Sequence, residues 1–249
     1  MNTLTAQAVL QTWEHVQGEH PVRRSLAVLH AAWPDVEPRE WGAMPIGARD
    51  AWLLTLHESL FGSELDTLVG CPACREPLEL SFSTTDLRPT PADEDAVAAM
   101  PSALRCDGYE LGYRLPNSDD LLEIIDARDD TPEAAVARLL ERCVLDARRD
   151  GTPAAVGELP PVVIDCLQQE MALRDRGADT RIALVCSACR HAFDRRFDIA
   201  AYLWDELDDW AQRTLAEVHT LAGAYGWSEP QILALSAMRR QRYIALVQG

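Results

Sequence analysis

Two short segments of the chain carry the residues best suited to chemistry. The segments are CPACR at residues 71–75 and CSACR at residues 186–190, and a long stretch of chain lies between them. Aligned on their cysteines, they also agree in residue type at four further positions: Arg75 with Arg190, Leu78 with Phe193, Glu79 with Asp194, and Phe82 with Phe197. We therefore expect each segment to form a strand, a CxxC turn and a second strand.

Together the two segments predict a metal site. A CxxC turn holds two thiolates close together with backbone N–H groups directed at the sulfurs, and two such turns supply a tetrahedral Cys₄ shell. Zinc suits four thiolates because it demands no other geometry and has no redox chemistry. The sequence thus predicts one Zn²⁺ per chain, held by Cys71, Cys74, Cys186 and Cys189. Four thiolates leave no position for a water molecule, so we expect a structural zinc and not a catalytic one.

Three alternatives to zinc remain open at this stage. Iron can occupy the same four-sulfur shell, the two motifs can act as dithiol redox centres, or the cysteines can simply be buried. A redox CxxC normally lies at the start of a helix, whereas strands are expected on both sides of each motif here. Many zinc knuckles have Gly after the second cysteine; because Arg75 and Arg190 stand there instead, we expect a slightly different or mildly strained turn.

No other part of the sequence predicts a catalytic site. Cys106, Cys143 and Cys166 lack a CxxC partner and are expected to be small buried hydrophobic residues. His57 lacks the second histidine of a zinc-protease motif and is expected on a helix surface. The acidic pairs at 119–120 and 129–130 fall at expected helix starts, where carboxylates act as caps. With no nucleotide-binding or hydrolase motif, we expect a protein that is not an enzyme.

The composition limits the classes of partner. The formal net charge is −17, and all 23 basic residues are arginine. A nucleic-acid backbone needs clustered positive charge, so we expect no nucleic-acid partner. No apolar run approaches the ~20 residues that span a bilayer, and the first residues do not resemble a signal peptide. We expect a cytoplasmic protein that can be incorporated into an assembled particle and whose thiols are reduced.

The remaining pattern predicts a mainly α fold with a small antiparallel β zinc ribbon (α+β), assembled from two sequence-distant CxxC knuckles. Three regions are expected: N-terminal helices over 1–66, a split zinc ribbon with an inserted hairpin and helices over 67–198, and a C-terminal region over 199–249. A Pro- and Asp-rich linker is expected over about 83–103, a hairpin at Asp107-Gly108, and inserted helices over about 118–128, 132–148 and 161–175.

The C-terminal region is expected to contain one long helix over 199–225 and two short helices after it. Aromatic residues and arginines are concentrated in the short helices, and such residues favour protein interfaces. This pattern predicts a partner-binding segment, although packing against the chain's own core is the simpler interpretation of the apolar stripe on the long helix. The predicted partner-binding residues are Trp227, Ile232, Leu235, Arg239, Arg240 and Tyr243.

Three stretches resemble a family of known proteins: PIGARDAWLLTLHESLFGSELDTLVGCPACREPLELSF, YRLPNSDDLLEI, and the region from IALVCSACRHAFDRRF through YGWSEPQILALSAMRRQRYIALV. They are similar to baseplate proteins, or baseplate hub assembly chaperones, of contractile-tailed phages and phage-tail-like contractile injection systems. The likeness covers roughly residues 45–82, 109–125 and 180–247. It implies the four knuckle cysteines as metal ligands and no catalytic residues.

The sequence therefore predicts a non-enzymatic assembly or structural protein of a contractile tail or injection system. The implied partners are baseplate, hub or tail proteins of the same gene cluster, with no nucleic acid, membrane or small-molecule substrate. The alternatives are a zinc-ribbon adaptor in transcription or nucleic-acid handling and a dithiol oxidoreductase. The charge of −17 disfavours the first alternative.

Overall fold

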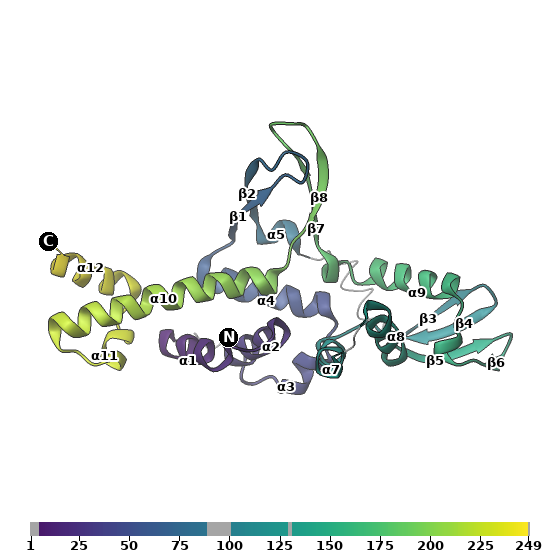
Figure 1. The fold of residues 1–249 in the computed structure, drawn as a ribbon. Coiled ribbons are helices and arrows are strands. Elements are labelled where there is room, and N and C mark those ends of the chain that lie inside the picture. Colours follow the sequence, from purple (N-terminus) through teal and green to yellow (C-terminus); the bar gives the residue numbers. More distant parts are fainter. Residues whose placement is uncertain (1–4, 89–100, 129–130, 249) are drawn as a thin grey trace. The chain divides into compact units, whose positions relative to one another are not determined.

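The computed structural model describes residues 5–88, 101–128 and 131–248, and this part of the chain is mainly helical (Figure 1). Its strands form small antiparallel sheets. In the first sheet, β1 (Glu64–Gly70) pairs with β2 (Pro77–Ser83). The second sheet has the strand order β3 (Ser102–Cys106), β4 (Tyr109–Tyr113), β5 (Val144–Arg149) and β6 (Thr152–Pro153). In the third sheet, β7 (Arg181–Val185) pairs with β8 (Ala192–Arg196). The expected mainly α fold with small antiparallel sheets is confirmed.

By its internal contacts the chain divides into two compact units. One unit comprises Met1–Pro38 together with Ala200–Gly249, and the other comprises Arg39–Ile199. The grouping differs from the expected regions 1–66, 67–198 and 199–249, because the first helices share a unit with the last ones and not with the helix that precedes the first knuckle.

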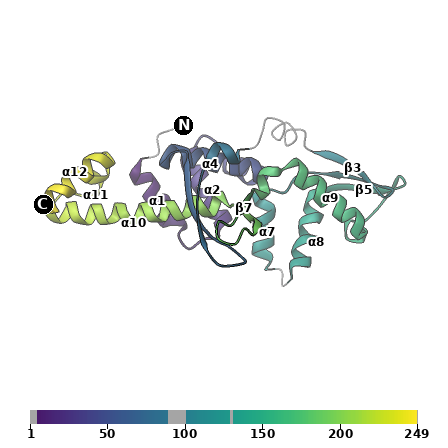
Figure 2. The ribbon, with the colours of Figure 1, turned by 90° about the horizontal axis from the view of Figure 1, so that it is seen from above.

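The first unit is built on the long helix α10 (Ile199–Tyr225), whose bounds match the predicted ones. It also contains α1 (Ala6–Val16), α2 (Pro21–Ala32), α11 (Glu229–Leu233) and α12 (Ala237–Gln248). Figures 1 and 2 both show α1 alongside α10, where Trp13 Nε1 donates a hydrogen bond of 2.8 Å to Asp208. The buried residues of the shared core are Leu10, Trp13, Ala211, Val218, Leu221, Ile232 and Leu233.

The second unit contains α3 (Pro38–Ala43), α4 (Ile46–Phe61), α5 (Thr84–Leu87), α7 (Ser118–Ala127), α8 (Pro132–Cys143), η1 (Val156–Glu158), α9 (Pro161–Arg174) and η2 (Arg176–Asp179). The predicted Asp107-Gly108 turn joins β3 to β4. Asp150-Gly151 is a second such turn, and both aspartates have positive φ (49°), as tight hairpin turns require. The core beneath this sheet contains Tyr109, Leu111, Tyr113, Leu140, Val144, Ala147, Leu159, Val163 and Leu167.

Two expected elements differ in the structure. The helix expected over 132–148 ends at Cys143, and residues 144–149 form β5, which pairs with β4. This strand depends on a partner more than 30 residues earlier, which local periodicity does not reveal. The expected linker over 83–103 includes α5, begun by a capping box between Ser83 and Asp86, and the start of β3. Residues 89–100 of that linker, and the expected acidic cap at 129–130, lie outside the described residues.

A buried carboxylate organises the start of α7. Asp120 is fully buried and closes a capping box with Asn117, whose backbone N–H donates to Asp120 at 3.0 Å. Arg114 and Arg142 donate to the same carboxylate at 2.5 and 2.7 Å. Burial alone would raise the pKa of Asp120, but the hydrogen bonds from the two arginines and the Asn117 N–H lower it below 3.8. Asp120 therefore joins α7, α8 and the end of β4 as a charged residue.

Candidate metal centre

Each cysteine pair lies in the turn of a two-stranded hairpin, as predicted. The strands β1 and β2 flank the first motif, and β7 and β8 flank the second. In the first turn, Cys71 N–H donates to Glu76 O at 2.9 Å and Arg75 N–H to Cys71 O at 2.9 Å. The second turn repeats both bonds, from Cys186 N–H to His191 O at 2.9 Å and from Arg190 N–H to Cys186 O at 3.0 Å.

The arginine after each second cysteine adopts a left-handed backbone conformation. The φ angle is 65° for Arg75 and 63° for Arg190. This region favours glycine and costs other residues about 1 kcal/mol. The expectation of a mildly strained turn is confirmed in both copies. Each arginine adopts the left-handed conformation that glycine commonly has at this position of a zinc knuckle.

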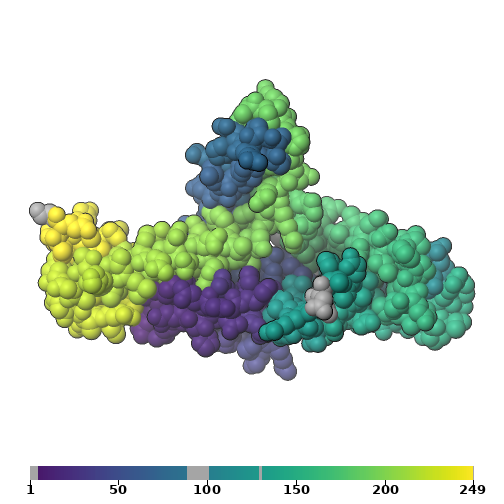
Figure 3. Space-filling view, viewed as in Figure 1, coloured from purple at the N-terminus to yellow at the C-terminus, as the bar shows by residue number. Residues whose placement is uncertain are grey.

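The structure brings the four cysteine sulfurs together. All four lie within 4.8 Å of one another, although the chain between the two motifs is long. The closest pairs cross between the hairpins: Cys71 Sγ lies 3.7 Å from Cys189 Sγ, and Cys74 Sγ lies 3.6 Å from Cys186 Sγ. In the alignment of the motifs, Cys71 corresponds to Cys186 and Cys74 to Cys189, so each of the two close pairs corresponds to the other. The hairpins are therefore related by an approximate two-fold symmetry. Figure 3 shows the blue atoms of the first hairpin beside the green atoms of the second.

These distances fit a tetrahedral thiolate shell. With Zn–S bonds of about 2.3 Å, a regular tetrahedron separates its sulfurs by about 3.8 Å. A disulfide would need about 2.05 Å, far shorter than either measured separation. The arrangement of the four sulfur atoms therefore fits a structural metal.

The hairpins meet without forming one sheet. If the two knuckles formed one continuous ribbon, strands of the two hairpins would pair; in the described residues they do not, and each hairpin is its own two-stranded sheet. Beyond the cysteines, the hairpins meet through Phe82 and Phe197, whose rings make an edge-to-face contact with centroids 5.2 Å apart. These phenylalanines occupy equivalent positions in the two motifs, so this contact also lies on the approximate two-fold axis.

The first turn of α4 contacts the segment inserted between the knuckles at two places. Within the insertion, after β4, Ile46 N–H donates to Pro116 O at 3.2 Å, and Arg49 donates to Ser118 Oγ at 3.1 Å. At the end of the insertion, Asp175 accepts the N–H of Gly47 at 3.1 Å and caps the helix. A Cβ atom on Gly47 would lie 1.9 Å from the Asp175 carboxylate, so only glycine fits at this position. The strand β7 begins shortly after this anchor.

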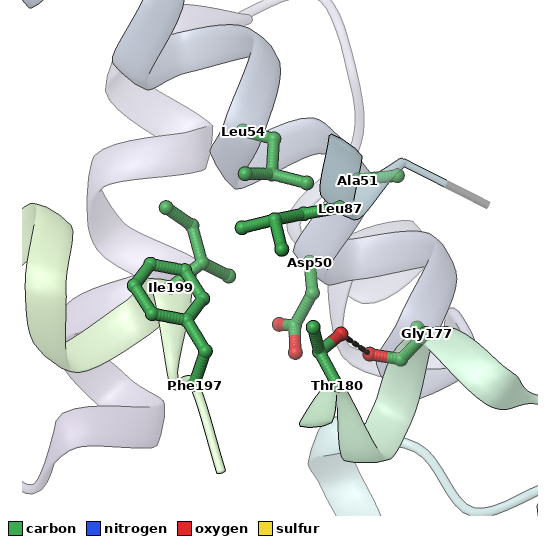
Figure 4. Close-up of a pocket in the computed structure, with 9 residues that line it drawn as sticks. Asp50, Ala51, Leu54, Leu87, Gly177, Thr180, Phe197 and Ile199 are labelled. Atoms are coloured by element: carbon green, nitrogen blue, oxygen red, sulfur yellow. Dashed lines mark hydrogen bonds between the residues drawn. The ribbon is translucent and has the colours of Figure 1, made fainter. Parts of the chain in front are cut away.

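A small cavity lies beside that anchor, lined by residues of α4, α5, η2 and the ends of the second hairpin (Figure 4). Its volume is about 10 Å³, the space of one water molecule. Asp50 extends into it toward Thr180, opposite the apolar side chains of Leu87 and Phe197. Burial raises the pKa of Asp50 to about 6, although Arg49 donates to its carboxylate at 2.8 Å.

The remaining expectations for cysteine and histidine have mixed outcomes. Cys143 is buried, as expected, and burial raises the pKa of its thiol to about 12. Cys106 and Cys166 are only half-buried and form a disulfide that joins β3 to α9. The expectation of two isolated buried residues is therefore wrong, and the expectation of reduced thiols is wrong for this pair. His57 is fully buried and not on the helix surface, and its ring lies 5.6 Å from that of Phe61. No local sequence signal indicates either outcome, because both depend on distant packing.

The structure places the six predicted partner-binding residues in different environments. Ile232 and Arg240 are buried, with Arg240 donating to Glu217 at 2.6 Å. Trp227 and Tyr243 are half-buried in an aromatic cluster with Tyr225, their own centroids 5.0 Å apart. Leu235 is half-buried, and Arg239 is exposed. Four of the six therefore pack within the first unit, and binding of a partner by this segment stays a prediction.

Comparisons with protein-family models, with curated proteins and with solved structures give no match to this chain. Within the described part of the chain, no helix combines the length and the apolar character that crossing a membrane requires.

Proposed function

We propose that Cys71, Cys74, Cys186 and Cys189 bind one structural Zn²⁺ and complete a split zinc ribbon. The observation that carries this proposal is the pair of cross-hairpin sulfur separations, 3.7 and 3.6 Å, which fit a tetrahedral thiolate shell. A metal with four sulfur ligands has no open position for a substrate, so its role is to hold two distant segments together. The two hairpins share no strand pairing, and the metal would supply most of the energy that joins them.

We propose further that the chain is a non-enzymatic assembly or structural protein of a contractile phage tail or phage-tail-like injection system, acting at the baseplate. The resemblance of residues 45–82, 109–125 and 180–247 to baseplate proteins is the basis of this proposal. Two of those three stretches supply the four clustered cysteines. The partners would be baseplate, hub or tail proteins of the same gene cluster. The net charge of −17 favours protein partners over nucleic acid.

The function is tested by expressing the complete gene cluster with and without an affinity tag on this chain. We expect the tagged chain to co-purify with baseplate, hub or tail proteins. Deleting the chain should leave sheath and tube components unassembled in electron micrographs. Complete, contractile particles in normal number after the deletion would rule out an assembly or structural role.

A second readout separates the proposal from a dithiol oxidoreductase. Reversible formation of a disulfide within each CxxC motif, in protein that binds no metal, would favour redox chemistry. The proposed function predicts that thiol-alkylating reagents react slowly with the four cysteines until the metal is removed by a chelator.

A further inference from the structure

The outward face of α12 is apolar and basic. Met238 and Leu246 are among the most exposed apolar side chains described, 76% and 73% accessible, and Arg242 lies between them. The spacing of four residues places all three on one face of the helix. Arg239 flanks them and is also exposed. This face, defined by Met238, Arg239, Arg242 and Leu246, is called the basic ridge below.

The opposite face of α12 fixes the orientation of the ridge. Arg240 is 3% accessible and donates to Glu217 of α10 at 2.6 Å and to Leu235 O at 2.9 Å. Tyr243 and Ile244 pack against the core of the first unit. Because these contacts hold α12 on α10, the ridge is presented by a packed helix and not by a loose end (Figure 1).

The charges on the ridge have no partner within the described residues. The side chains of Arg239 and Arg242 form no ion pair there, in contrast to Arg240. The sequence of α12, AMRRQRYIALVQ, contains three arginines and no acidic residue, in a chain whose net charge is −17. A guanidinium group beside exposed apolar side chains is suited to a carboxylate on an apolar surface.

We propose that the basic ridge docks onto an acidic amphipathic helix of another protein. Met238 and Leu246 would pack against apolar residues spaced three or four apart on that helix, and Arg239 and Arg242 would pair with its flanking Asp or Glu residues. The proposal rests on the assembly role proposed above and adds the chemical class of the partner segment. It also moves the docking residues from the buried Ile232 and Arg240 to the exposed side of α12.

Charge argues against the same face of a second copy as the partner. Two copies of α12 packed through their ridges would bring Arg239 and Arg242 close to the same arginines of the other copy, with no carboxylate on either helix. Like charges placed together at an interface cost several kcal/mol. An acidic helix removes this cost and compensates both arginines.

The proposal is tested by photocrosslinking in the full chain. Leu246 is replaced by p-benzoylphenylalanine, the chain is expressed with the proteins of its gene cluster, and the crosslinked peptide is sequenced. We expect a segment of another protein in which Asp and Glu outnumber Lys and Arg and apolar residues recur every three or four positions. The same probe at Leu145, exposed on β5, should not label that segment.

Charge reversal provides the matched control. The Arg239→Glu, Arg242→Glu variant should lower the crosslink yield about tenfold, whereas Arg195→Glu, Arg213→Glu, with the same change in net charge, should not. Unchanged circular dichroism checks that both variants fold. Labelling of lipid, of a second copy or of a segment that is not acidic, no labelling at all, or a yield unaffected by charge reversal, would overturn the proposal. An acidic helix in a protein unrelated to contractile tails would sustain it and contradict the proposed function instead.

Discussion

The carboxylate of Asp120 shows how one charged residue is accommodated in an apolar setting. It is fully buried, yet two arginines and a backbone N–H donate to it. Removing one partner from such a cluster leaves the other charges uncompensated, which is more costly than never burying the group. Both arginines are about one-third exposed, so solvent screens part of this cost.

We expect Asp120→Asn to lower the free energy of unfolding by about 2–4 kcal/mol at pH 7. Because the pKa of Asp120 is lowered in the folded state, its stabilising effect is present above the ordinary value of 3.8 and is lost as the pH falls through the folded value. The variant should therefore lose less stability than the wild type below pH 4. Urea titrations at pH 7 and pH 3 measure both effects. The exposed neighbour Asp119→Asn is the control, and equal losses in the two variants would contradict this account.

Asp50 should give a pH dependence of the opposite sign. Burial raises its pKa to about 6, so the folded state binds a proton more tightly than the unfolded state does. Its contribution to stability is greatest below pH 4 and declines as the pH rises through about 6. We expect Asp50→Asn to flatten the stability profile between pH 4 and 6.5, measured by thermal unfolding, while the exposed Asp165→Asn leaves the profile unchanged. A steeper profile in the Asp50 variant would contradict the assignment.

Single residues were predictable where their chemistry is local. The spacing of the cysteines identifies the four clustered sulfurs, and the arginine after each pair indicates a strained turn. The environments of His57 and of Cys106 were not predictable, because burial of the first and the disulfide of the second depend on chain segments far away in sequence. Arg240 was predicted to bind a partner. Its buried contact with Glu217 was not predictable, because this contact depends on the packing of α12 on α10.

At the scale of elements, the first turn of α4 contacts the inserted segment at Pro116 and Ser118, after β4, and at Asp175, near the end of the segment. We expect Gly47→Ala to destabilise the protein by about 1–3 kcal/mol, because its Cβ would meet the Asp175 carboxylate at 1.9 Å and the Ala178 backbone N at 2.9 Å. Gly223→Ala in α10 meets nothing within 4 Å and should stabilise by about 0.5–1 kcal/mol. Chemical denaturation compares the two. A neutral Gly47 variant would mean that Asp175 does not hold α4.

The two hairpins depend on the metal for their association. We expect Cys186→Ser to abolish stoichiometric metal binding and to lose about 4 kcal/mol, the linkage energy of a ligand present at a thousand times its dissociation constant. The loss should appear as faster hydrogen exchange and proteolysis in residues 64–83 and 181–197, because the hairpins would lose the link between their turns and keep side-chain contacts such as that of Phe82 with Phe197. Cys143→Ala should keep its metal. A Cys186 variant that binds zinc and melts like the wild type would exclude the split site.

Element boundaries were predicted well where helix signals are strong. The long helix expected over 199–225 has the same bounds as α10, Ile199–Tyr225. The strand β5 was interpreted as a continuation of α8, since its buried residues Val144 and Ala147 are three positions apart, a spacing that also fits a helix. One ribbon was expected from the two knuckles. In the structure, the strands of each hairpin form backbone hydrogen bonds with each other, and the two hairpins contact each other through side chains.

At the scale of the whole molecule, the order of residues along the chain does not reveal the two compact units. The first and last segments form one unit because the apolar faces of α1 and α10 bury each other, and this cannot be deduced from either helix alone. The repeated CxxC motif is the long-range relation that can be recognised directly in the sequence. Each motif supplies two thiolates, and a tetrahedral metal with four sulfur ligands needs both motifs.

The most direct test of the central claim is zinc K-edge X-ray absorption on protein purified without added metal, together with elemental analysis. The account predicts about one zinc per chain, surrounded by four sulfur atoms at about 2.3 Å with no nitrogen or oxygen ligand. The same spectrum would identify iron if iron occupied the shell. Absence of metal, or a shell containing a water molecule or a histidine, would contradict the claim that Cys71, Cys74, Cys186 and Cys189 form one structural zinc site.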